Sequence, residues 1–97
     1  MSTLHVLSHS PFGDDRLSSC LRLIGSADAL VLSGDAVYAL QPGTAPFTAL
    51  QARQIKLFVL AEDAQARAME VPTWAEAVDY PGFVELSINH HKVNSWL

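Results

Sequence analysis

The chain has 97 residues and a net charge of −4, and only 16% of its residues are charged, against roughly 25% in an ordinary soluble domain. Its hydrophobic content of 49% excludes disorder, yet no run approaches the about 20 apolar residues of a membrane span. No basic segment with an apolar stretch opens the chain, so we expect neither a signal peptide nor a membrane partner. A small domain must cover most of its surface with polar groups, so sparse charge predicts a surface partly covered by another subunit.

The basic residues and the cysteine exclude two further classes. The six Lys and Arg residues are scattered along the chain, whereas a nucleic-acid groove needs them clustered, so we expect no direct nucleic-acid partner. Cys20 is the single cysteine. It excludes an internal disulfide and a cysteine-rich zinc site, and it fits a reducing cytoplasm.

The first third of the chain alternates strand and helix. Residues 3–8 form a short apolar strand, which Pro11 and Gly13 end, and Asp14 or Asp15 provides a helix N-cap. Residues 16–24 form an amphipathic helix that Gly25 closes. Its apolar positions follow the spacing i, i+3, i+4, i+7: Leu17, Cys20, Leu21 and Ile24. Residues 29–32 form a second strand, and residues 36–40 fit a helical turn or a strand equally well.

The rest of the chain continues the alternation. Residues 41–45 form a loop, and Pro46 lies in the first turn of a helix that ends at residue 53. Residues 55–60 are apolar on both faces, as in the interior of a parallel sheet. Glu62 and Asp63 open a helix to about residue 69, residues 75–78 form a short strand, and Asp79 caps a helix over residues 80–91. Residues 93–97 are apolar enough to dock on the domain. We therefore expect a single α/β domain over residues 1–97, with a mainly parallel four- to five-stranded sheet flanked by helices.

Cys20 is the candidate nucleophile, and its residue pattern favours a structural role. A reactive cysteine needs solvent access and a cationic or helix-terminal environment that favours the thiolate. Cys20 instead lies near the middle of the apolar stripe of its helix, which favours a packed core thiol.

The other polar candidates do not form a recognisable constellation. His5 and His9 lie too far apart on an extended strand to share one zinc ion, and His90 and His91 point in different directions on a helix, so no metal site or cofactor is expected. The segment from Ser8 to Asp15 contains the residue types of a hydrolytic triad and follows the first strand, where open α/β sheets bind ligands. A self-associating ligand-binding module and a small hydrolase using His9 therefore stay open as alternatives.

The whole chain resembles the TusB/DsrH family, the small subunit of sulfur-relay complexes. The resemblance rests on the order and spacing of several segments: 4–12 (LHVLSHSPF), 21–23 (LRL), 33–39 (SGDAVYA), 56–63 (KLFVLAED) with 66–67 (AR), 79–86 (DYPGFVEL) and 95–97 (SWL).

The resemblance implies a DsrE-like α/β fold and a cytoplasmic complex with sister subunits of the same fold, TusC and TusD, arranged as a dimer of heterotrimers. Such a complex accepts persulfide sulfur from TusA and passes it through TusE to a thiouridylase for 2-thiouridine at the tRNA wobble position. The main sulfur-carrying cysteine belongs to the TusD-like subunit, so this member of a sulfurtransferase complex is expected to assemble and position its partners.

The sulfur-oxidising DsrH branch carries a cysteine in its first helix, and Cys20 matches that place. The resemblance therefore makes Cys20 a persulfide candidate, in conflict with the core position that the helical period favours. The two agree if the apolar stripe faces a neighbouring subunit near the sulfur-transfer site instead of this chain's own core. It also leaves dissimilatory sulfur oxidation as an alternative to tRNA thiolation.

Overall fold

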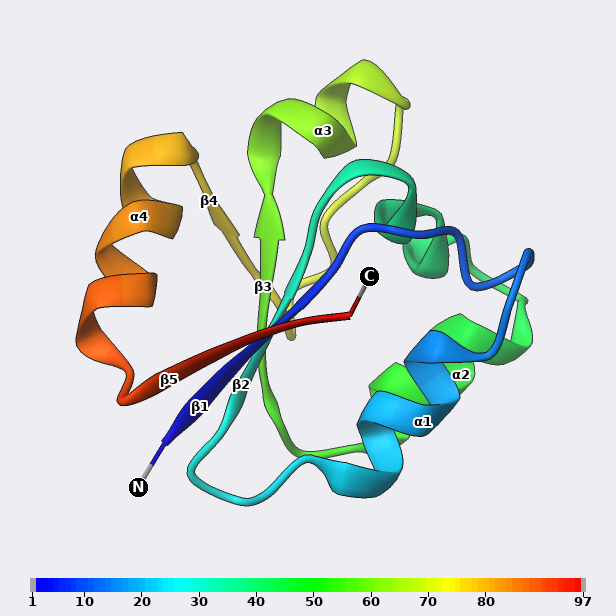
Figure 1. Cartoon of the computed structure of the whole chain (residues 1–97). Coiled ribbons are helices and arrows are strands. Elements are labelled where there is room, and N and C mark those ends of the chain that lie inside the picture. The colour runs from blue at the N-terminus through cyan, green and yellow to red at the C-terminus, as the bar shows by residue number, and fades with distance from the viewer. Residues whose placement is uncertain (1, 97) are drawn as a thin grey trace.

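A computed structural model, in which residues 2–96 are described, contains one five-stranded sheet with the strand order β4-β3-β2-β1-β5. All four neighbouring strand pairs are parallel, which confirms the predicted α/β architecture. The elements in chain order are β1 (Thr3–Leu7), α1 (Arg16–Leu23), β2 (Ala29–Leu32), the 3-10 helix η1 (Gly34–Leu40), α2 (Ala45–Ala52), β3 (Lys56–Leu60), α3 (Ala61–Ala66), β4 (Glu76–Val78), α4 (Tyr80–Asn89) and β5 (Lys92–Trp96) (Figure 1).

The structure decides two elements that the sequence left undefined. Residues 36–40, which fitted a helical turn or a strand, belong to the 3-10 helix η1. The C-terminal tail docks as β5, an edge strand paired with β1 along its whole length. The helix predicted to reach about residue 69 ends at Ala66. Ala68 adopts a left-handed φ of 55°, and the N–H of Met69 bonds to Ala64 O, so the chain turns away there.

Acidic residues hold the helix N-termini, in part across elements. Asp79 caps α4, as predicted, by accepting a bond from the N–H of Gly82 at 2.8 Å. Glu62 and Asp63 do not cap their own helix, contrary to expectation. Glu62 accepts from the first N–H of α4, at Tyr80, and Asp63 accepts from the first N–H of η1, at Gly34. These two carboxylates of α3 therefore fasten the starts of two neighbouring helices to the carboxyl edge of the sheet.

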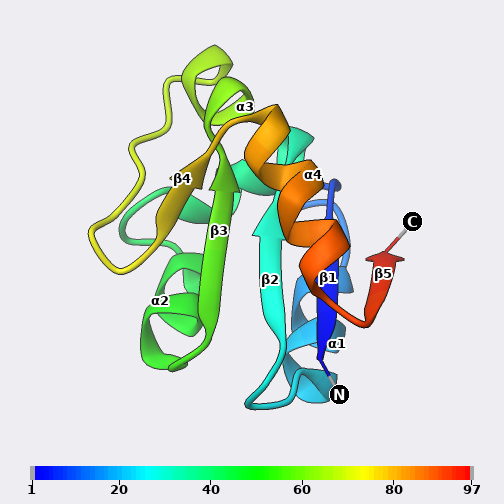
Figure 2. The same cartoon turned by 90° about the vertical axis from the view of Figure 1, so that its left-hand side faces the viewer.

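The two faces of the sheet are covered unequally. Helices α1, α2 and η1 lie on one face, and the larger core cluster forms beneath them from alternate strand residues such as Leu7, Leu30 and Leu32. The opposite face carries α4 alone, which crosses β1 and β2 and leaves β3 without a helix above it (Figure 2). The core cluster on this side is small: Leu4, Ala29 and Val31 are buried.

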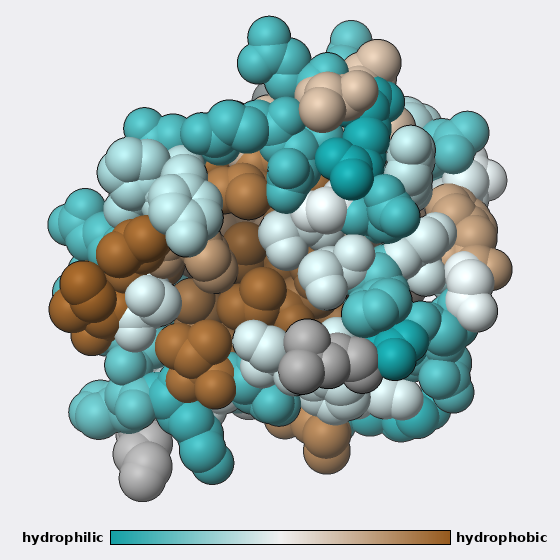
Figure 3. All heavy atoms as spheres, turned by 45° about the horizontal axis from the view of Figure 1, so that its top comes forward, coloured by the Kyte–Doolittle hydropathy of each residue, from teal (hydrophilic) through white to brown (hydrophobic). Residues whose placement is uncertain are grey.

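The α4 side consequently exposes apolar surface. Val6, Phe58, Phe83 and Leu86 are only partly buried against the small cluster. Figure 3 shows apolar side chains gathered over α4 and continuing onto the adjacent sheet, with polar residues around them. Exposed residues of this side at a helical spacing of four are Tyr80, Val84 and Ile88, and Val93 on β5 is also exposed. We call this surface the α4 face. The low charge content predicted apolar surface of this kind, and its covering by another subunit stays a prediction.

Candidate functional site

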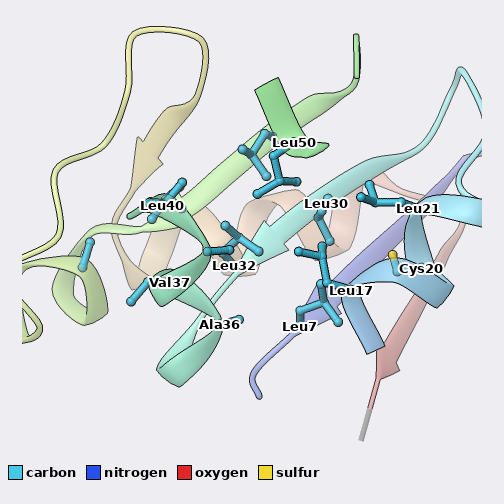
Figure 4. Packing of buried hydrophobic residues seen from close by; sticks show 14 residues of the cluster. Leu7, Leu17, Cys20, Leu21, Leu30, Leu32, Ala36, Val37, Leu40 and Leu50 are labelled. Atoms are coloured by element: carbon cyan, nitrogen blue, oxygen red, sulfur yellow. The ribbon is translucent and has the colours of Figure 1, made fainter. Parts of the chain in front are cut away.

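Cys20 lies in the middle of the main core. Its side chain is 0% exposed and packs with Leu17 and Leu21 of α1 beneath the sheet (Figure 4). Burial raises the pKa of the thiol to about 11, and the carboxylate of Asp28 adds to this rise, while Arg53 opposes it. The thiol is therefore neutral near pH 7 and shielded from reagents. The stripe of α1 packs against this chain's own sheet, so the interpretation that it faces a neighbouring subunit is wrong.

A buried histidine anchors the C-terminal strand, a feature that the sequence analysis missed. His5 is 5% exposed, and its Nδ1 accepts a bond from the indole N–H of Trp96 at 3.1 Å. Because an indole nitrogen only donates, Nδ1 must be the unprotonated nitrogen, so Nε2 carries the proton. Nε2 lies 3.4 Å from Oδ2 of Asp28. The network thereby joins β1, the start of β2 and β5.

Asp28 is the fixed end of this network. Its carboxylate also accepts the backbone N–H of Gly25 and that of Thr3, both at 2.9 Å. These bonds, with the Gly25 N–H contributing most, hold the pKa of Asp28 below its usual range. The available signal in the sequence was an aspartate immediately before one apolar strand and a histidine inside the preceding one.

The loop after β1 does not assemble the residues of a hydrolytic triad. Ser8 Oγ and His9 Nδ1 are 3.5 Å apart, at the limit of a hydrogen bond. The carboxylate of Asp14 is engaged elsewhere: it accepts the backbone N–H of Arg16 at 3.0 Å and pairs with the Arg16 guanidinium. The Arg16 N–H is the largest cause of the lowered pKa of Asp14. The geometry of the described residues therefore does not favour the hydrolase alternative.

A pocket of about 490 Å³ lies beside this loop, between the first turns of α1 and α2. Its walls are mainly apolar, from residues including Phe12, Leu17 and Pro46, with Asp14 and Ser18 as polar groups. It lies beside the segment from Ser8 to Asp15, where the sequence predicted the ligand site of a ligand-binding module.

The remaining histidines lie apart. His90 follows the last residue of α4, and its Nδ1 is 2.8 Å from the carbonyl oxygen of Leu86 in that helix. His91 accepts the backbone N–H of Ser2 at 3.3 Å. Within residues 2–96 no three His, Cys, Asp or Glu side chains are grouped to hold a metal ion. None of the helices in the same range is long and apolar enough to cross a membrane.

The comparisons with known proteins point to one family. A family model described as "DsrH like protein" matches residues 9–93. The chain is 38% identical over 95 residues to Protein TusB of Erwinia tasmaniensis, covering 96% of this chain and 99% of that protein. With the same coverage it is 37% identical to Protein TusB of Enterobacter sp. (strain 638) and 33% identical to that of Escherichia coli O139:H28.

The fold is also found in a solved structure. The crystal structure of the ychN protein from E. coli superposes with a TM-score of 0.73 at 19% identity, covering 99% of this chain and 100% of the other. This likeness confirms the expected DsrE-like fold.

Proposed function

Because the chain belongs to the DsrH-like protein family, we propose that it is a subunit of a cytoplasmic sulfur-relay complex. Its partners are sister subunits of the TusC and TusD type, together with a TusA-like sulfur donor and a TusE-like acceptor. The complex carries persulfide sulfur toward 2-thiouridine at the tRNA wobble position, and two heterotrimers form the assembly. This chain acts mainly by assembling and positioning the sulfur-carrying subunit.

The observation that carries the proposal is the α4 face. Exposed Val84 and Ile88 on α4 and partly buried Phe58 on the sheet form an apolar surface on a small chain with a net charge of −4. Parallel sheets are normally covered on both faces, and apolar patches of this kind occur where another protein binds. A sister subunit seated there would complete the missing layer.

The environment of Cys20 supports the division of labour. A sulfur carrier needs an accessible thiolate, whereas this thiol is neutral and enclosed by its own core. A positioning subunit requires no reactive thiol. Cys20 is nevertheless the single cysteine of this chain, and so the residue at which a persulfide could form.

Co-expression tests the assembly. The tagged chain is expected to purify with its TusC- and TusD-like partners in a constant ratio. A chain that purifies without them under co-expression contradicts the proposal.

Sulfur labelling tests Cys20. The complex is incubated with a desulfurase, cysteine and the TusA-like donor, and intact masses are measured under non-reducing conditions. We expect one added sulfur on a sister subunit and none on this chain, and we expect a Cys20→Ser complex to support tRNA thiolation. Sulfur on the wild-type chain that disappears in Cys20→Ser would make Cys20 a carrier.

The pocket beside the loop after β1 favours a second candidate, a self-associating ligand-binding module. Native mass spectrometry of the co-expressed preparation separates the two readings. Homo-oligomers alone, formed in the presence of the sister subunits, would favour the module. The DsrH-type role in sulfur oxidation predicts the same assembly but no effect of deleting the chain on tRNA thiolation.

A further inference from the structure

The two edges of the sheet are protected to different extents. At one edge, β4 has only three residues and begins with Glu76. At the other edge, β5 has five residues, pairs with β1 without interruption from Lys92 to Trp96, and contains no proline. No described element lies beyond it (Figure 2). Soluble proteins normally shield an edge with a short strand, a proline, a bulge or a central charge. Of these protections β5 has a single charge, that of Lys92, which lies at its first position and not at its centre.

The hydrogen-bonding direction of each β5 residue follows from one contact. Lys92 donates its backbone N–H to Ser2 O, so it faces β1. Because alternate residues of a strand direct their N–H and C=O groups to opposite sides, Asn94 and Trp96 also face β1. Val93 and Ser95 therefore direct both backbone groups toward the open edge, where each can bond to another strand.

We propose that this edge pairs with β5 of a second copy of the chain, antiparallel and centred on Asn94. In this register Val93 lies opposite the partner's Ser95, and the outward groups of both residues bond in two pairs. If one strand slides by two residues along the other in either direction, one of these two hydrogen-bonded pairs is lost within Lys92–Trp96. The arrangement is self-complementary, as a two-fold interface requires.

The side chains favour the same register. Lys92 lies opposite the partner's Trp96, on the face of the sheet that also carries His5. Trp96 is partly exposed, and its bond to His5 holds the ring in place, so the ammonium group can rest on the indole as a cation–π pair. A parallel pairing in register would instead set Lys92 against another Lys92. Charge therefore selects the antiparallel dimer.

Disulfide trapping tests the register. Two Asn94 residues at the centre form a non-hydrogen-bonded pair with Cα atoms about 4.5 Å apart, within the range for a disulfide. Under mild oxidation of the full chain, Asn94→Cys is expected to give a covalent dimer as the main product. Asn89→Cys, exposed on α4, is the control and is expected to stay monomeric on reducing-agent-free gels.

Sedimentation tests the hydrogen bonds. Ser95→Pro removes an N–H that β1 does not use, so the circular dichroism spectrum of the folded chain is expected to persist while the mass falls toward the 10.5 kDa of one chain. Ser95→Ala keeps the N–H and is expected to stay dimeric. The proposal is overturned by a wild-type chain that sediments as a monomer at every concentration, or by a Ser95→Pro chain that dimerises like wild type. Crosslinking of Asn94→Cys to a co-expressed sister subunit instead of itself would overturn it as well.

Discussion

The two faces of the sheet differ in what this chain supplies to cover them. On the α1 side, three helices bury alternate residues of the central strands, so the face is complete within the chain. On the α4 side, one helix with no fully buried residue covers part of the same strands. Since both faces of β2 are apolar in sequence, the difference in covering arises from the connections between strands. We therefore expect the α1 side to supply most of the stability of the chain and the α4 side to be available for association.

The largest effect is expected from breaking the complete face. Leu30 is fully buried under α1, and Leu30→Ala should lower the free energy of unfolding by about 2–5 kcal/mol because it leaves a cavity. Leu86→Ala, on the partly covered side, is the matched control and should cost less than half as much in the isolated chain. Urea denaturation measures both. Equal losses would contradict the assignment of stability to the α1 face.

The thiol in the complete face predicts a dependence on alkaline pH. Burial raises the pKa of Cys20 from 9.0 to about 11, so the folded chain holds this proton more tightly than the unfolded chain. The protonated thiol therefore contributes to the free energy of unfolding. This contribution is fully present below pH 9 and is lost as the pH rises to about 11, which lowers the free energy of unfolding by up to about 2–3 kcal/mol. Denaturation curves from pH 8 to 11 should fall more steeply for wild type than for Cys20→Ala, which keeps every other titrating group. Parallel curves would show that the thiol is not shielded.

A smaller loss is expected at the edge of the complete face. Trp96→Phe keeps an aromatic ring but removes the indole N–H, which leaves Nδ1 of buried His5 without its donor. An unsatisfied buried acceptor costs about 1–3 kcal/mol. Amide hydrogen exchange should therefore accelerate along β5 more than along β3. Uniform acceleration over the sheet would contradict a local anchor.

Much of the fold could be predicted because its signals are local. The period of the helix containing Leu17 and Leu21, the apolar run of β3 and the Asp79 cap are contained in a few neighbouring residues, and each is confirmed. Strand β5 was predicted only to dock, because its pairing depends on β1 at the other end of the chain.

The candidate site was less predictable because its partners are distant in sequence. The bond from Trp96 to His5 spans 91 positions, and the bond from Gly34 to Asp63 spans 29. The position of Cys20 in the core was predicted from helical period alone. The low charge content predicted that an apolar surface exists. Its location on the α4 face could not be predicted, because it depends on the order of the strands, which sets where α4 crosses the sheet.

The smallest effect on stability is expected on the α4 face, and it separates folding from association. Ile88 is 74% exposed, so Ile88→Ser should change the free energy of unfolding by less than about 0.5 kcal/mol. Leu23 is 70% exposed on the opposite side, on α1, and Leu23→Ser is the matched control. In co-expression with the sister subunits, Ile88→Ser should lose most of the co-purified partner, because a hydroxyl then enters an apolar contact, while Leu23→Ser should retain it. Equal retention by both variants would mean that the complex uses another surface and that the α4 face is not where the missing layer is supplied.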